Sequence, residues 1–151
     1  YDIEDNESLQ LLYKKLEDID GIEFKKCVSQ IELKEELNRA LLFIYPTYVS
    51  ETFCNSCIEA ASCGCKIIAT KIGALNEVIG DYAELIDVNI EKYEHPYYEI
   101  IDQDYIQQII NKTEEIINQY INKSDKLESD LRNQIDYVKK KYNWENYKNI
   151  F

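Results

Sequence analysis

The stretch LLFIYPTYVSETFCNSCIEAASCGCKIIATKIGALNEVIGDYAELID, residues 41–87, decides the fold of this chain. It opens with an unbroken apolar run, residues 41–45, which Pro46 ends, and a second apolar run follows at residues 66–70. Such runs are typical of parallel strands that are covered on both faces. The segment between them has the length of a loop and one helix. The pattern therefore predicts a strand–loop–helix–strand crossover on one parallel sheet, which is the α/β class.

The loop after the first strand, residues 46–54, is where we expect this unit to bind a ligand. Open parallel sheets bind ligands beyond the carboxyl ends of their strands. A helix predicted to begin near Asn55 leaves backbone N–H groups unpaired, and its positive end favours phosphate. Glu51 and Glu59 would repel phosphate, but they suit sugar hydroxyls, which donate hydrogen bonds to a carboxylate. A phosphate flanked by hydroxyl-bearing rings describes a nucleotide sugar.

Both glutamates also have an interpretation that needs no ligand. Glu59 would then only complement the positive end of its helix, and Glu51 would be a solvated loop residue. The residue pattern alone leaves both interpretations open.

Longer motifs surround these two residues. Glu51 and Glu59 stand in a Glu-x7-Glu spacing, followed by EAASCGCKIIAT at 59–70, GALNEVI at 73–79 and YNWE at 142–145. Together they resemble the donor-binding half of a retaining glycosyltransferase of the GT-B fold, of the glycosyl transferases group 1 type. The resemblance implies a Rossmann-like, doubly wound parallel sheet, present here as an incomplete part of the C-terminal domain.

The resemblance also implies a role for each residue of the loop and of the helix start. Glu51, as the catalytic residue, would contact hydroxyls of the transferred sugar, and Glu59 would hold the ribose hydroxyls. Four residues would bind the sugar and the diphosphate between them: Phe53, Cys54, Asn55 and Ser56. The nucleotide base would be contacted by an upstream turn, for which a plain strand-to-helix connection is the alternative: Cys27, Val28 and Ser29.

Several positions depart from the pattern of that family. Cys54 stands where glycine is commonest, so a side chain is expected in space that glycine leaves for close approach. Three residues, rather than the usual two, separate Thr47 from Glu51. Lys66 replaces the usual proline, and Ala74 replaces the second glycine of the turn. These departures bear on the loop geometry more than on the fold.

A complete GT-B enzyme has two doubly wound domains with the active site between them. The acceptor-binding domain and the opening strand–helix, with its Arg and Lys for the diphosphate, have no counterpart here. The absence of methionine also suggests that the chain begins within a longer protein. We therefore expect a fragment that binds a nucleotide diphosphate sugar and transfers nothing alone. No metal or other cofactor is expected, because the helix dipole and basic groups stabilise the leaving diphosphate.

Two hypotheses from other classes stay open. The chain could be a non-catalytic interaction module that keeps the fold without transfer activity. It could instead be a thiol protein, with Cys54 and Cys57 as a redox pair whose pKa is lowered by the helix N-terminus. A four-thiolate zinc site would add Cys63 and Cys65. Because Cys57 and Cys63 lie nearly two helical turns apart, those four sulfurs do not converge without distortion.

Composition limits the partners. The 151 residues carry a formal net charge of −12, which argues against nucleic acid and anionic membranes. An anionic donor must then be held by local features, the helix N-terminus and lysines such as Lys25, Lys26 or Lys71. No run of eighteen apolar residues and no signal peptide occurs, and the five cysteines are an odd number. We predict reduced thiols and a cytoplasmic location.

The remaining elements follow from periodicity and capping signals. One partial nucleotide-sugar-binding domain is predicted over residues 1–151, with its core at 20–88 and its C-terminal helices in 102–151. Four parallel strands are predicted: 22–28, 41–45, 66–70 and 83–88. Further helices are expected from Leu9 to Gly21, after a capping box of Ser29 and Glu32, and after Ser124. His95 is expected in a loop without a catalytic role, and Trp144 is expected to be buried.

Overall fold

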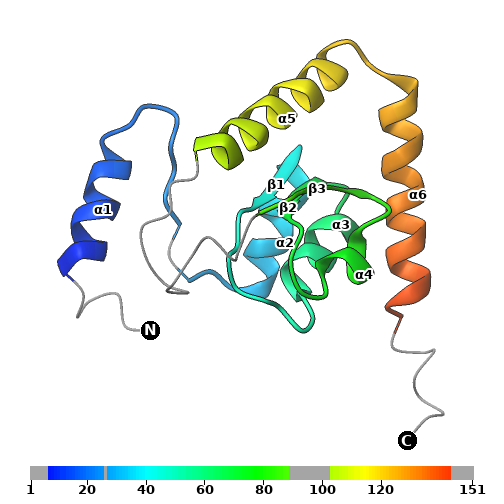
Figure 1. The fold of residues 1–151 in the computed structure, drawn as a ribbon, viewed down its shortest axis with the longest axis horizontal. Coiled ribbons are helices and arrows are strands. Elements are labelled where there is room, and N and C mark those ends of the chain that lie inside the picture. Colours follow the sequence, from blue (N-terminus) through cyan, green and yellow to red (C-terminus); the bar gives the residue numbers. More distant parts are fainter. Residues whose placement is uncertain (1–6, 26, 89–102, 144–151) are drawn as a thin grey trace, which may run out of the picture. The chain divides into compact units, whose positions relative to one another are not determined.

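The computed structural model describes residues 7–25, 27–88 and 103–143 (Figure 1). His95 and Trp144 lie outside these residues. The elements, in chain order, are α1 (Glu7–Glu17), α2 (Gln30–Arg39), β1 (Leu42–Tyr45), α3 (Asn55–Ser62), β2 (Lys66–Thr70), α4 (Leu75–Ile79), β3 (Ala83–Ile86), α5 (Gln103–Ile121) and α6 (Asp125–Lys141). The chain divides into two compact units, Tyr1–Leu33 and Lys34–Phe151, which are described separately below.

The first unit contains α1 and the start of α2. The predicted capping box forms as expected: the backbone N–H and the hydroxyl of Ser29 donate to Glu32 Oε2 at 2.8 and 2.7 Å. In return, the backbone N–H of Glu32 donates to Ser29 Oγ at 3.3 Å. These bonds satisfy backbone groups that a helix start leaves unpaired, and so they fix where α2 begins.

The predicted strand at residues 22–28 is wrong, because no described residue of this segment lies in a strand. Its largest apolar side chain, Phe24, packs against Tyr13 of α1 with ring centroids 4.3 Å apart. Ile22 and Val28 are exposed. A strand needs a neighbour that satisfies its backbone groups. Every described strand belongs to the sheet of the second unit, and none pairs with this segment.

The second unit is built on a three-stranded parallel sheet in the order β1-β2-β3. Leu42 is paired with Lys66, and Ile67 is paired with Ala83. All five residues of the central strand, β2, are buried. The structure therefore confirms the α/β class and three of the four predicted parallel strands.

Helix α5 covers one face of this sheet. Ile68 of β2 and Ile86 of β3 form an apolar cluster with Tyr105 and Ile116 of α5. The hydroxyls of Thr70 and Tyr105 share a hydrogen bond of 2.5 Å inside this layer. Because alternate residues of a strand point to opposite faces, Ile67 and Ala69 of β2 face the other way, toward α3.

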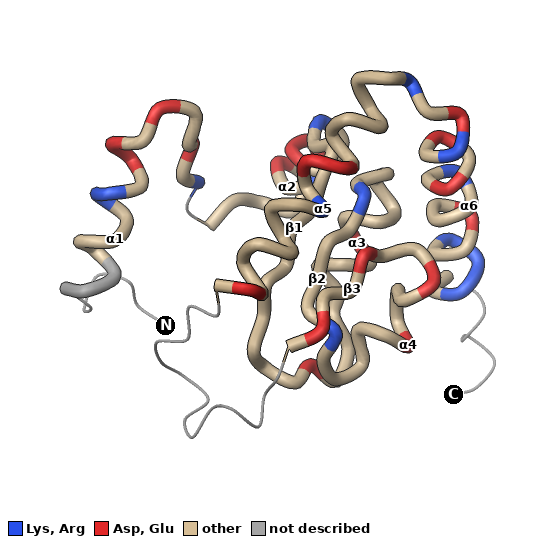
Figure 2. The backbone as a smooth tube through the Cα atoms, turned by 45° about the horizontal axis from the view of Figure 1, so that its top comes forward, with Lys and Arg blue, Asp and Glu red and all other residues tan. Residues whose placement is uncertain are grey.

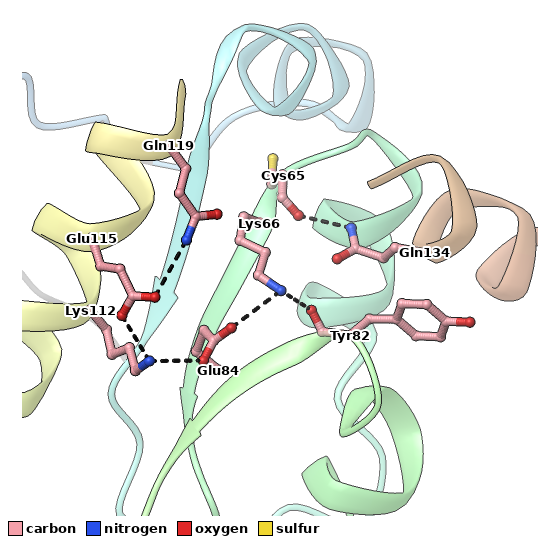
Figure 3. A network of polar contacts seen from close by, with 8 residues as sticks. All are labelled: Cys65, Lys66, Tyr82, Glu84, Lys112, Glu115, Gln119 and Gln134. Atoms are coloured by element: carbon pink, nitrogen blue, oxygen red, sulfur yellow. Dashed lines mark hydrogen bonds and ion pairs between the residues drawn. The ribbon is translucent and has the colours of Figure 1, made fainter. Parts of the chain in front are cut away.

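Helix α6 packs on α3, on the far side from the sheet (Figure 1). The buried side chain of Gln134 donates from Nε2 to the carbonyl of Ala61 at 3.1 Å and to that of Cys65 at 2.9 Å (Figure 3). Helix ends leave carbonyl groups without intrahelical partners. Gln134 satisfies the end of α3, and it thereby ties α6 to the helix whose start faces the candidate site.

A charged network joins the sheet to α5 and explains the lysine that replaces a proline (Figure 3). Lys66 donates to the carbonyl of Tyr82 at 2.8 Å and pairs with Glu84 at 3.5 Å. Glu84 also pairs with Lys112 of α5 at 3.4 Å, and Lys112 pairs with Glu115 at 2.9 Å. A buried ammonium is tolerated when it is paired and hydrogen-bonded. Lys66 can therefore open the buried central strand.

Charges of both signs alternate along α6, with acidic residues in its first turn and three lysines in its last (Figure 2). The predicted cap is confirmed, because Ser124 Oγ accepts from the backbone N–H of Leu127 at 3.4 Å. This polarity complements the helix dipole. Within the described parts of the chain, no helix has the length and apolar composition that crossing a membrane requires.

Replacing Ile68 should reveal the contribution of the core. Ile68→Ala removes methylene groups from a side chain that is 1% exposed, and should lower the free energy of unfolding by about 2–5 kcal/mol. The matched control, Ile121→Ala, changes a side chain that is 70% exposed. It should change the free energy of unfolding by no more than about 0.5 kcal/mol. Urea unfolding followed by circular dichroism measures both. Equal losses would contradict the assigned core.

Candidate functional site

The candidate site lies where β1 and β2 end. β1 ends at Tyr45, the loop 46–54 follows, and α3 begins at Asn55 before the chain returns along β2. Since β1 and β2 are parallel, the loop and the start of α3 lie at the carboxyl edge of the sheet, as predicted. The turn 71–74 follows β2 at the same edge.

A backbone contact joins the loop to this turn. The N–H of Ala74 donates to the carbonyl of Glu51 at 2.8 Å. Gly73 has φ +54°, and a Cβ there would lie 2.5 Å from the Glu51 carbonyl oxygen and 2.7 Å from its nitrogen. Glycine is therefore required for its backbone conformation and for the space it leaves. The conformation of Glu51 is set by a residue 22 positions away.

The extra residue between Thr47 and Glu51 is accommodated by a local turn. Thr47 Oγ1 accepts from the backbone N–H of Val49 at 3.1 Å, which is the hydrogen bond of a Ser/Thr turn. The longer loop therefore still delivers Glu51 to the carboxyl edge.

The side chain of Glu51 is half-buried, and it is held by Tyr45. The Tyr45 hydroxyl donates a short hydrogen bond to Glu51 Oε1. This bond to the carboxylate, together with burial, raises the pKa of Tyr45 above its ordinary value. The phenol, which is protonated at physiological pH even at its ordinary pKa, is the donor of this bond. Sequence reasoning assigned Tyr45 only to the strand and missed this role.

Cys54 does not intrude on the edge as its replacement of glycine suggested. Its side chain is 2% exposed, and Cys57 below it is fully buried. Burial, followed by the contact with Cys54, raises the pKa of the Cys57 thiol. The redox hypothesis expected a lowered pKa, so for Cys57 that expectation is wrong. The two buried cysteines pack beneath the loop.

The start of α3 is open to solvent. Asn55 and Ser56 are exposed, and Cys54 at the N-cap makes no side-chain capping bond. The N–H of Ile58 donates to the Cys54 carbonyl, so the three preceding N–H groups lie ahead of the helical ladder. The first turn holds no acidic residue. This arrangement favours an anion at the helix start.

The other predicted residues are distributed around this edge. Glu59 is half-buried, one helical turn beyond Ser56 on α3. Phe53 is exposed and meets the Tyr142 ring edge-on, with centroids 5.6 Å apart. Lys71, in the turn after β2, pairs with Asp87 at 3.2 Å. Tyr142 is a further neighbour that sequence reasoning did not assign to this region.

The three residues predicted to contact the base belong to the first unit, ahead of α2: Cys27, Val28 and Ser29. All three are exposed. Ser29 has a demonstrated local role, because it caps α2.

The cysteines do not form the zinc site that was weighed as an alternative. Cys65 lies beyond the opposite end of α3 from Cys54, and its thiol donates to the carbonyl of Leu37 at 3.2 Å. In the described ranges, no group of three or more His, Cys, Asp or Glu side chains is placed to hold a metal ion.

The fold and this edge define an α/β, Rossmann-like domain whose candidate ligand region is built from a loop and a helix start. Residues 2–141 match the family Glycosyl transferases group 1. The chain belongs to this family, so glycosyl transfer is its general class of activity. No curated protein and no solved structure matches the chain.

Gly73→Ala tests whether the loop depends on the turn. The added Cβ meets backbone atoms of Glu51, which should cost about 1–3 kcal/mol more than the strain of the left-handed conformation alone. Gly64→Ala is the matched control: Gly64 has φ +88°, and its added Cβ meets only the Ile135 side chain at 3.5 Å. Denaturant unfolding compares the two variants. A smaller loss for Gly73→Ala would contradict the packing described.

Proposed function

We propose that this chain is the donor-binding part of a retaining glycosyltransferase of the GT-B fold, and that its carboxyl edge binds a nucleotide diphosphate sugar. One observation carries this proposal. The loop that Tyr45 and Ala74 hold through Glu51 leads directly into the open start of α3, whose first turn holds no acid. A fixed carboxylate beside an anion-binding helix end suits a sugar attached to a phosphate.

The diphosphate would lie on the first backbone N–H groups of α3, at Asn55 and Ser56. Lys71 adds a positive charge at the same edge, and about half of its side chain is exposed. In this proposal the helix dipole and these donors stabilise the leaving diphosphate, and no metal ion takes part.

The sugars would be held by carboxylates. Glu51 accepts hydrogen bonds from hydroxyls of the transferred sugar, with backbone N–H groups of Phe53 and Cys54 against the same ring. Glu59, one turn further along α3, accepts from the ribose hydroxyls. Support for both roles comes from the Glu-x7-Glu spacing and from the preference of ionised carboxylates for hydroxyl donors.

Acceptor binding would involve another part of the protein. The acceptor would be bound by a separate domain of the same protein, so transfer requires the full-length protein. Retention is proposed from the likeness of the Glu-x7-Glu region to retaining enzymes of this family.

Neutral replacements of the two glutamates test the donor site. Glu51→Gln and Glu59→Gln should each lower kcat/KM for transfer by the full-length protein about 10- to 100-fold, because each removes a hydrogen bond to a charged acceptor. The control is Glu114→Gln, the same change on the exposed surface of α5. Transfer is measured by release of the nucleoside diphosphate. Unchanged kcat/KM in both site variants would refute the proposed site.

A further inference from the structure

We propose that Tyr45 is a positioning residue that holds one oxygen of Glu51, so that the carboxylate presents its other oxygen to the donor sugar. This inference rests on the proposed function and deepens it. It makes Glu51 a fixed, single-oxygen acceptor, and it assigns a role to a side chain that lies in the strand rather than in the loop.

The position of Tyr45 in the fold suits this role. It is the last residue of β1, and its ring stacks on that of Phe43, two residues earlier, with centroids 6.0 Å apart and planes inclined by 13°. Residues two apart on a strand share a face, so both rings lie on the side opposite Ile68 and α5. The hydroxyl is therefore carried by a rigid element, which places a functional group more accurately than a loop does.

Glu51 needs such a partner because the backbone contacts do not orient its carboxylate. Ala74 and Gly73 fix the main chain of Glu51, while its side chain has several rotatable bonds. The hydrogen bond from Tyr45 to Oε1 selects one orientation. When an acceptor is ordered before the ligand arrives, less conformational freedom is lost on binding.

The chemistry of the pair is also suitable. A phenol is a donor to an ionised carboxylate, and such charge-assisted bonds are stronger than neutral ones. Burial also favours the protonated phenol. Because Tyr45 donates to Oε1, it does not compete for the second oxygen of Glu51, which can accept from a sugar hydroxyl.

The test compares two ligands that differ only in the sugar. Affinities for UDP-, GDP- and ADP-glucose, and for UDP, GDP and ADP, are measured by calorimetry on the full-length protein. For the nucleotide sugar that the protein binds, Tyr45→Phe should lower the affinity about five- to tenfold. The affinity for the matching nucleoside diphosphate should change by less than about twofold, because in this proposal the diphosphate does not contact Glu51.

Two further variants make the test specific. Tyr120→Phe removes another tyrosine hydroxyl that is hydrogen-bonded, at 3.0 Å to the Leu41 carbonyl, and should leave both affinities unchanged. In a double-mutant cycle, Tyr45→Phe should cost almost nothing further once Glu51 is replaced by Ala, which removes the acceptor, since the two residues act as one unit. Thermal unfolding of each variant confirms that it is folded.

The outcomes separate the inference from the proposed function. Equal weakening of both ligands by Tyr45→Phe, or additive effects in the cycle, would make Tyr45 a structural residue and overturn the inference. If Glu51→Gln weakens the nucleotide sugar while Tyr45→Phe does not, the donor site stands and the inference alone fails. If no nucleotide sugar or nucleoside diphosphate binds the unaltered protein, both the proposed function and the inference are overturned.

Discussion

The close backbone approach of Gly73 to Glu51 is the constraint on which the candidate site depends. The loop after β1 and the turn after β2 meet at the same edge only because the strands are parallel, and they pack tightly only because Gly73 has no Cβ. The bond from Ala74 to the Glu51 carbonyl closes this contact. The loop 46–54 and the turn 71–74 are thereby joined into one surface, and the start of α3 lies beside it. Such connecting segments are mobile in most proteins.

The rest of the second unit holds that surface in place. β2 is buried at every position, with α5 on one face of the sheet and α3 on the other. The pairing of Lys66 with Glu84 anchors the strand at the edge opposite the site. Gln134 ties the far end of α3 to α6, so the helix is restrained at the end that does not face the ligand region. Packing and polar contacts therefore keep the helix start aimed at the carboxyl edge.

The sequence predicted most of the elements of the second unit, but not the side-chain contacts between them. The apolar runs at 41–45 and 66–70 predicted buried parallel strands, because each is short and continuous and a loop and one helix separate them. The strand prediction for residues 22–28 was wrong because a strand depends on a pairing partner. Phe24 of this segment packs on Tyr13 instead. Proximity of the loop and α3 to the carboxyl edge followed from topology. The bond from Tyr45 to Glu51 and the burial of Cys54 did not, since both depend on side-chain packing in three dimensions.

The central claim is that the loop, the turn and the start of α3 form one anion-binding surface. Titration of the ¹⁵N-labelled protein with UDP, GDP or ADP, followed by amide chemical shifts, tests it most directly, because the proposed ligands of the diphosphate are backbone N–H groups. The account predicts that the largest shifts fall on residues 53–57 and 71–74, with little change along α5. The largest shifts at the corner between α5 and α6, around Lys123 and Ser124, would contradict it.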